Sequence, residues 1–130
     1  MGTNYYLIEK TCPHCGRGDE RLHIGKSSAG WCFSLHVDPD MGINSLADWE
    51  ARWSKPDASI VDEYGEGVSP ADMLRTITQR SWKGHATDDP HWLAQNEAVP
   101  GPNGLARHRI GRHCIGHGES TYDLMPGEFS

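Results

Sequence analysis

The sequence predicts a single α+β domain. Strands from the two ends of the chain are expected to form a small antiparallel sheet, with two to three short helices inserted between them. Three patterns support this class: period-two alternation near the N-terminus, amphipathic helical spacing in the middle, and further strand-like segments after a loop rich in proline and glycine. A chain of 130 residues supports one hydrophobic core, so we expect one domain over residues 1–130.

The first strands are expected over Asn4–Ile8 and in a hairpin over residues 21–37 (RLHIGKSSAGWCFSLHV). Apolar residues alternate with polar ones on both sides of a Ser-Ser-Ala-Gly segment, as in a hairpin with one apolar face. If the turn is centred on Ser28 and Ala29, His23 lies roughly opposite Ser34. That register predicts a polar face, away from the core, that carries His23, Cys32 and His36.

Three segments in the middle of the chain read as helices. Residues 44–53 combine a capping-box pattern with apolar residues three and four positions apart. A second helix is expected from Ser69-Pro70, where a capping residue precedes a proline, to about Arg80. A short third helix is expected to start at Asp89-Pro90 and to run through Trp92 and Leu93. Between the first two, a short strand at Ile60-Val61 pairs with Val68 through a glycine-containing turn.

The C-terminal part is expected to return to strands. A loop at residues 100–104 (PGPNG) is followed by the strand-like segments LARHRI and TYDLM. A strand here would lie close to the N-terminal strands and complete the sheet.

Composition excludes several classes of protein. Hydrophobic residues make up 36% of the chain, the mean hydropathy is −0.64, and no apolar run approaches the roughly 18 residues of a membrane helix. The N-terminal residues lack the basic start and apolar stretch of a signal peptide, so we expect a cytoplasmic protein. The net charge of −6 argues against generic binding of duplex DNA, which favours a broadly basic surface.

Cysteine spacing is the strongest chemical signal. Cys12 and Cys15 form a C-x2-C pair followed by glycine, and Cys114 and His117 repeat this spacing and the glycine. Two such knuckles would supply the four ligands of a structural Zn²⁺ site. The alternative places the second half of the site on the polar face of the hairpin, with His23, Cys32 or His36 as ligands. The two-knuckle set is the preferred one, and the alternative stays open.

Two further sets of residues are candidate binding sites. The hairpin turn could hold a phosphate-bearing small molecule through backbone amides and the side chains of His23, Lys26, Ser27, Ser28 and Trp31. Residues 38–100 carry five Lys/Arg against twelve Asp/Glu, a net charge of −7. An acidic face there could dock on a basic partner surface through Asp57, Asp62, Glu63, Glu66 and Asp72.

The segments MGTNYY, CPHCGR, LHIGKSSAGWCFSLHV and HGESTYDLMPGEFS resemble those of a group of small, uncharacterised phage and prophage proteins. The resemblance covers about the first 40 and the last 20 residues of this sequence and carries no catalytic residue. It implies an accessory protein that acts on host machinery, by occluding a defence complex or by sequestering a signalling nucleotide.

Together these patterns predict a non-enzymatic, zinc-stabilised phage protein in the host cytoplasm. Its expected role is to bind and inhibit a host protein or ribonucleoprotein, as an anti-CRISPR-like counter-defence inhibitor does. A small-ligand-binding protein is the first alternative, and a zinc-dependent hydrolase or nuclease is the second.

Overall fold

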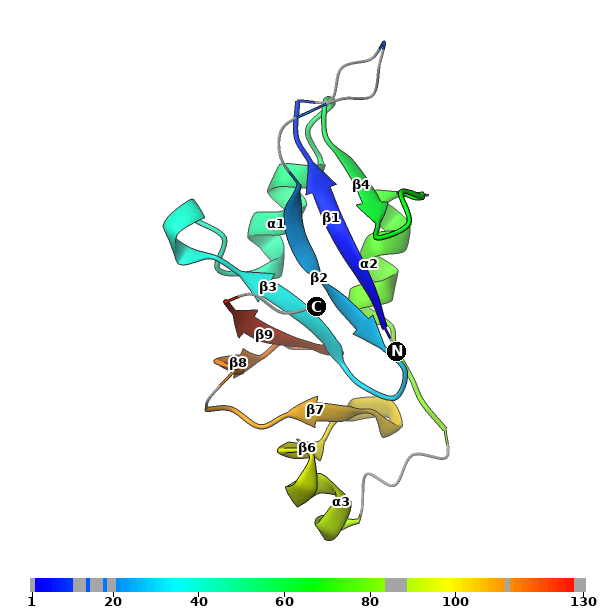
Figure 1. Cartoon of the computed structure of the whole chain (residues 1–130), viewed down its shortest axis with the longest axis vertical. Coiled ribbons are helices and arrows are strands. Elements are labelled where there is room, and N and C mark those ends of the chain that lie inside the picture. Colours follow the sequence, from blue (N-terminus) through cyan, green and yellow to red (C-terminus); the bar gives the residue numbers. More distant parts are fainter. Residues whose placement is uncertain are drawn as a thin grey trace.

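Strands from both ends of the chain meet in one mixed sheet, drawn in Figure 1. The computed structural model describes residues 2–10, 14, 18, 21–83, 89–111 and 113–127. Within these residues the sheet has seven strands in the order β5-β4-β1-β2-β3-β9-β8, and a second sheet pairs β6 with β7. The strands are β1 (Gly2–Ile8), β2 (Leu22–Ser28), β3 (Phe33–Val37), β4 (Ser59–Asp62), β5 (Gly67–Val68), β6 (Ala98–Pro100), β7 (Ala106–His108), β8 (Gly116–His117) and β9 (Tyr122–Pro126).

Helices α1 (Leu46–Trp53) and α2 (Pro70–Thr78) both lie behind the large sheet in Figure 1, and α3 (Pro90–Gln95) lies beside the small sheet. Short 3-10 turns occur at Pro39–Met41 and Pro102–Gly104. The α+β class is therefore confirmed. No helix in the described parts of the chain is long and apolar enough to cross a membrane.

The core fills the space between the large sheet and the first two helices. Helix α1 contributes Trp49 and Trp53 and α2 contributes Met73 and Ile77, as their three- and four-residue spacing predicts. Each central strand contributes buried apolar residues from one of its two faces. These strand residues are Leu7, Ile24, Phe33, Leu35 and Ile60.

Both helix starts follow the local sequence. The Ser45 hydroxyl accepts the Asp48 N–H, and the Ser69 hydroxyl accepts the Asp72 N–H ahead of Pro70. Helix α2 ends at Thr78, two residues before the expected end. The hairpin of β4 and β5 forms with the expected Ile60–Val68 pairing.

The large sheet differs from the expected small antiparallel one. Strand β9 joins β3 in parallel register, Phe33 opposite Tyr122 and Val37 opposite Pro126, so the sheet is mixed. Alternation along a strand shows which residues face the core, but it does not fix the direction in which a distant strand joins the sheet. The expected knuckle around Cys12 and Cys15 lies outside the described residues.

The turn of the predicted hairpin is centred differently. Lys26, not His23, lies opposite Ser34, which centres the turn on Gly30. Gly30 has a φ of 82°, a left-handed conformation that glycine adopts without strain. Arg80 secures this turn from outside the hairpin, because its guanidinium donates hydrogen bonds to the carbonyls of Ser28 and Trp31.

Cys32 is buried in the structure, contrary to its expected place on an exposed polar face. Its side chain is 1% exposed, because β7 covers it: the Cys32 N–H donates to the Ala106 carbonyl at 2.8 Å. His23 and His36 do share one face, with ring centroids 5.7 Å apart. The small sheet was not expected from the sequence, and it explains why alternation alone assigns Cys32 to the wrong environment.

Candidate metal centre

Three metal-ligating side chains converge where the C-terminal strands meet. The ligand atoms of Cys114, His117 and Asp123 all lie within 4.8 Å of one another. His117 on β8 is the direct antiparallel partner of Asp123 on β9, and directly opposed side chains lie on one face of a sheet. Cys114 lies just before β8 and is fixed by a bridge to Ile110. The local pairing therefore brings the three groups together.

The carboxylate of Asp123 is buried and firmly oriented. Its Oδ1 accepts a 2.8 Å hydrogen bond from the Arg107 guanidinium, and its Oδ2 accepts the His108 N–H at 2.9 Å. The side chain of Asp123 is 0% exposed and that of Arg107 only 10% exposed. Each carboxylate oxygen keeps a further lone pair for a metal ion. The acidic partner of Arg107 is therefore this C-terminal aspartate and not a carboxylate of the acidic segment at 38–100.

The other two groups are held by backbone carbonyls. His117 Nε2 lies 2.7 Å from the His108 carbonyl oxygen. Because a carbonyl only accepts, Nε2 carries the proton and Nδ1 keeps the lone pair that binds metals. The Cys114 thiol donates to the Gly116 carbonyl at 3.3 Å, and burial raises its pKa. Metal binding would therefore release the thiol proton.

This donor set fits Zn²⁺. Thiolate, imidazole and carboxylate are the three side-chain ligands that zinc uses, and a histidine that donates its other N–H to a carbonyl is the usual outer-shell arrangement. Two of the four predicted ligands, Cys114 and His117, are in the group, while Cys12 and Cys15 lie outside the described residues. Sequence reasoning missed Asp123. The one feature of the sequence that could have indicated Asp123 is the presence of an acidic residue inside the strand-like segment TYDLM.

The alternative ligands do not form a comparable group within the described parts of the chain. His23 and His36 are neighbours: His36 Nδ1 lies 3.0 Å from the His23 carbonyl, and His23 Nε2 lies 2.8 Å from Asn4 Oδ1. Cys32 lies apart from them, under β7. The histidine pair therefore lacks the cysteine that the sequence assigned to it.

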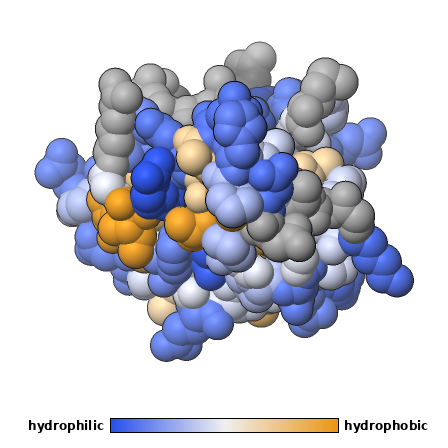
Figure 2. Space-filling model, turned by 90° about the horizontal axis from the view of Figure 1, so that it is seen from below, coloured by the Kyte–Doolittle hydropathy of each residue, from blue (hydrophilic) through white to orange (hydrophobic). Residues whose placement is uncertain are grey.

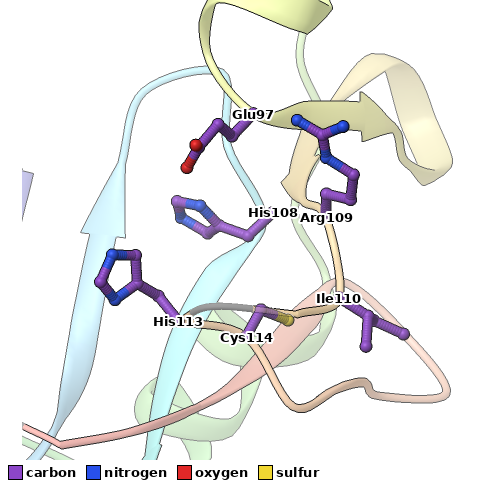
Figure 3. Close-up of a pocket in the computed structure, with 6 residues that line it drawn as sticks. All are labelled: Glu97, His108, Arg109, Ile110, His113 and Cys114. Carbon is purple, nitrogen blue, oxygen red and sulfur yellow. The ribbon is translucent and has the colours of Figure 1, made fainter.

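A cavity of about 230 Å³ adjoins the metal-ligating group (Figure 3). The Glu97 carboxylate points toward the His108 ring, the His113 ring lies below them, and Arg109 points away. Burial is the main cause that lowers the pKa of His108.

Ile110 and Ile115, near Cys114, are each 56% exposed. Figure 2 shows this end of the molecule as mostly hydrophilic, with a hydrophobic patch toward one edge.

The predicted phosphate-binding residues lie along a strand rather than around one turn. His23, Lys26, Ser27 and Ser28 belong to β2, whose backbone pairs with β1 on one side and β3 on the other. Trp31 lies beyond the strand and stacks on His108, with ring centroids 4.8 Å apart. The structure therefore does not gather these five side chains around one pocket of exposed amides.

The acidic residues predicted to bind a partner divide into two groups. Asp62, Glu63 and Glu66 occupy the tight turn between β4 and β5. Asp57 and Asp72 lie at the other end of that hairpin, before β4 and after β5. Asp72 forms an exposed ion pair with Arg75 at 2.6 Å. Sequence reasoning also missed Tyr64 at the tip of the turn, which is 75% exposed.

Comparison of the chain with protein-family models, curated proteins and solved structures finds no match. The resemblance to small phage proteins therefore stays a prediction.

Proposed function

We propose that this protein is a non-catalytic binding protein whose C-terminal strands are cross-linked by a structural Zn²⁺. The observation that carries the proposal is the convergence of Cys114, His117 and Asp123 within 4.8 Å. A zinc ion there would tie the loop before β8 to both β8 and β9, and it would neutralise a buried thiolate and carboxylate. The fourth ligand in this proposal comes from the knuckle of Cys12 and Cys15.

Burial favours a structural ion over a catalytic one. Cys114 and Asp123 are both 0% exposed, whereas a catalytic zinc needs an open position that water and substrate can reach. The buried ion pair of Asp123 with Arg107 further fixes the ligand. We therefore favour a structural role for the proposed zinc ion over a catalytic role in a hydrolase or nuclease.

The zinc proposal is tested by native mass spectrometry of protein purified without added metal. We expect one zinc ion on the wild type and none on Cys114→Ser, with Cys32→Ser as the matched control because Cys32 is also a buried thiol but lies outside the group. Zinc retained at full occupancy by a folded Cys114→Ser variant would contradict the site. A Cys12→Ser/Cys15→Ser variant tests the knuckle separately: retention of zinc there would place the fourth ligand elsewhere.

We further propose that the protein acts as a phage accessory protein that binds a basic surface of a host defence complex, in the manner of an anti-CRISPR inhibitor. Tyr64 specifically favours this reading. The turn that carries it is preorganised, because Asp62 Oδ1 accepts the N–H groups of both Tyr64 and Glu66 at 2.9 Å. Glu63 is fixed on the same turn, since its carboxylate accepts the Asn4 N–H at 2.8 Å.

An exposed tyrosine surrounded by carboxylates has the character of a binding hot spot. Tyrosine is enriched among the residues that dominate interface energies, and surrounding charge speeds association with a partner of opposite sign. A rigid turn also loses little conformational entropy on binding. In this proposal the turn of Asp62–Glu66 makes the first contact, and Asp57 and Asp72 belong to a separate region.

The partner proposal is tested by biolayer interferometry against purified CRISPR effector ribonucleoproteins. We expect Tyr64→Ala and Glu66→Lys each to weaken binding about tenfold or more, which corresponds to about 1.4 kcal/mol. Asp57→Lys is the charge-matched control at the other end of the hairpin. Binding that survives about 0.5 M salt unchanged would contradict docking by charge, because exposed charges are strongly screened there.

A further inference from the structure

A second cavity lies between the turn that joins β2 to β3 and the C-terminal end of α2. Its volume is about 450 Å³, within the size range of small-molecule sites. It is distinct from the cavity beside the metal-ligating group, with which it shares no lining residue. The lining includes two arginines, polar side chains and a tryptophan. These residues include Gly30, Arg75, Gln79, Arg80, Ser81 and Trp82.

Arg80 is a fixed, half-buried cation without an acidic partner among the described residues. Its Nε donates to the Trp31 carbonyl at 3.0 Å and its Nη2 to the Ser28 carbonyl at 2.8 Å. Two of its five N–H donors are used in this way, which leaves three for another acceptor. A desolvated guanidinium without a counter-ion favours the binding of an anion, and burial lowers the pKa of this group for the same reason.

Arg75 supplies a second guanidinium at the rim. It lies on α2, one helical turn before Gln79, and its side chain is 60% exposed. Its only ion pair in the described part of the chain is with the exposed carboxylate of Asp72. Exposed ion pairs of this kind are weak, so Arg75 can turn toward a bound anion at small cost. Two arginines at one cavity contrast with the net charge of −6 of the whole chain.

Trp82 adds a flat aromatic surface to this basic cavity. Its side chain is 41% exposed, and its backbone is anchored because the Trp82 N–H donates to the Asn103 carbonyl at 3.0 Å. The Asn103 side chain in turn donates to the Arg80 carbonyl at 2.9 Å. The same short loop therefore positions the arginine and the tryptophan. A nucleobase can stack on such a ring, and this contact is available to any of the bases because each has a flat aromatic face.

We propose that this cavity binds a nucleotide, with its phosphate on Arg80 and Arg75 and its base against Trp82. The phosphate and the planar ring require two different kinds of contact, and the cavity offers both at its lining. This site goes beyond the zinc and partner proposals and depends on neither. It also differs from the phosphate site expected from sequence, because only the turn after Ser28 is shared, through Ala29 and Gly30.

The proposal is tested by isothermal titration calorimetry with mononucleotides, cyclic dinucleotides and inorganic phosphate. We expect at least one nucleotide to bind more tightly than phosphate, and Arg75→Gln to weaken it about tenfold or more, equivalent to about 1.4 kcal/mol. Trp82→Ala should weaken the nucleotide but not phosphate. Arg109→Gln is the matched control, since Arg109 lines the other cavity.

Arg75 and Trp82 are exposed enough that their variants are expected to fold, so the test does not depend on Arg80, which also holds the turn. Arg80→Lys is a further variant, in which the charge stays and the planar donor geometry is lost. The proposal is overturned if no nucleotide binds more tightly than phosphate, if Arg75→Gln binds like the wild type, or if Arg109→Gln abolishes binding.

Discussion

Replacing Arg107 by methionine tests how the two sheets are joined. Arg107 on β7 donates to the Asp123 carboxylate at 2.8 Å and to the Tyr122 carbonyl at 2.8 Å, both on β9. The substitution keeps most of the apolar stem but leaves the Asp123 carboxylate buried without its cation. Breaking a buried pair on one side costs about 3–5 kcal/mol. For a domain of this size that corresponds to a loss of about 10–20 °C in Tm.

The free energy of unfolding should be measured by urea denaturation, with EDTA in every sample because Asp123 is also a proposed zinc ligand. Arg109→Met is the matched control: this arginine lies two residues further on and is exposed, so we expect a change within about 0.5 kcal/mol. A loss below about 1 kcal/mol in Arg107→Met, or an equal loss in Arg109→Met, would refute the reasoning that burial makes this pair essential.

Three further predictions concern other parts of the fold. Burial and the neighbouring His36 lower the pKa of His23 from 6.5 to about 4, so the unfolded chain binds this proton more readily. The contribution of His23 to the free energy of unfolding should be fully present above about pH 6.5 and be lost as the pH falls toward 4. We expect a loss of about 1–2 kcal/mol, because solvent screens a half-buried ring. The His23→Gln variant should show a flatter dependence of this free energy on pH, as measured by urea denaturation. Ser69→Ala should cost about 1 kcal/mol through the lost N-cap, with Ser54→Ala near neutral; equal losses would contradict the cap. Burial is the main cause that raises the pKa of Cys32 to about 11. Alkylation of this thiol in the native protein should therefore be at least about a hundredfold slower than in the unfolded chain, as measured by peptide mass mapping. Fast alkylation of the native protein would show instead that Cys32 lies at the surface.

The elements predicted most accurately from the sequence are those whose signals are local. The caps Ser45 and Ser69 and the spacing of Trp49 and Trp53 fix the two main helices, because a helix forms from contacts within four residues. The hairpin of β4 and β5 follows from a glycine turn between two short apolar segments. These features need no information from the rest of the chain.

The candidate metal centre was predicted only in part for the opposite reason. Cys114 and His117 are three residues apart and carry a recognisable spacing, whereas Asp123 becomes a neighbour only when β9 folds back on β8. The two arginines and Trp82 of the proposed nucleotide cavity have no common motif either. Residues that meet through a sheet register or a helix end have no fixed separation in sequence.

The sequence by itself determined the α+β class, the N-terminal starts of α1 and α2, the alternation of the central strands and two of the three side chains in the candidate metal centre. Only the tertiary structure decided that β9 lies parallel to β3, that the small sheet buries Cys32, and that Asp123 pairs with Arg107. The physical reason is that helical and strand periodicity arises from local backbone geometry, whereas burial and ion pairing depend on which distant segments the core brings into contact.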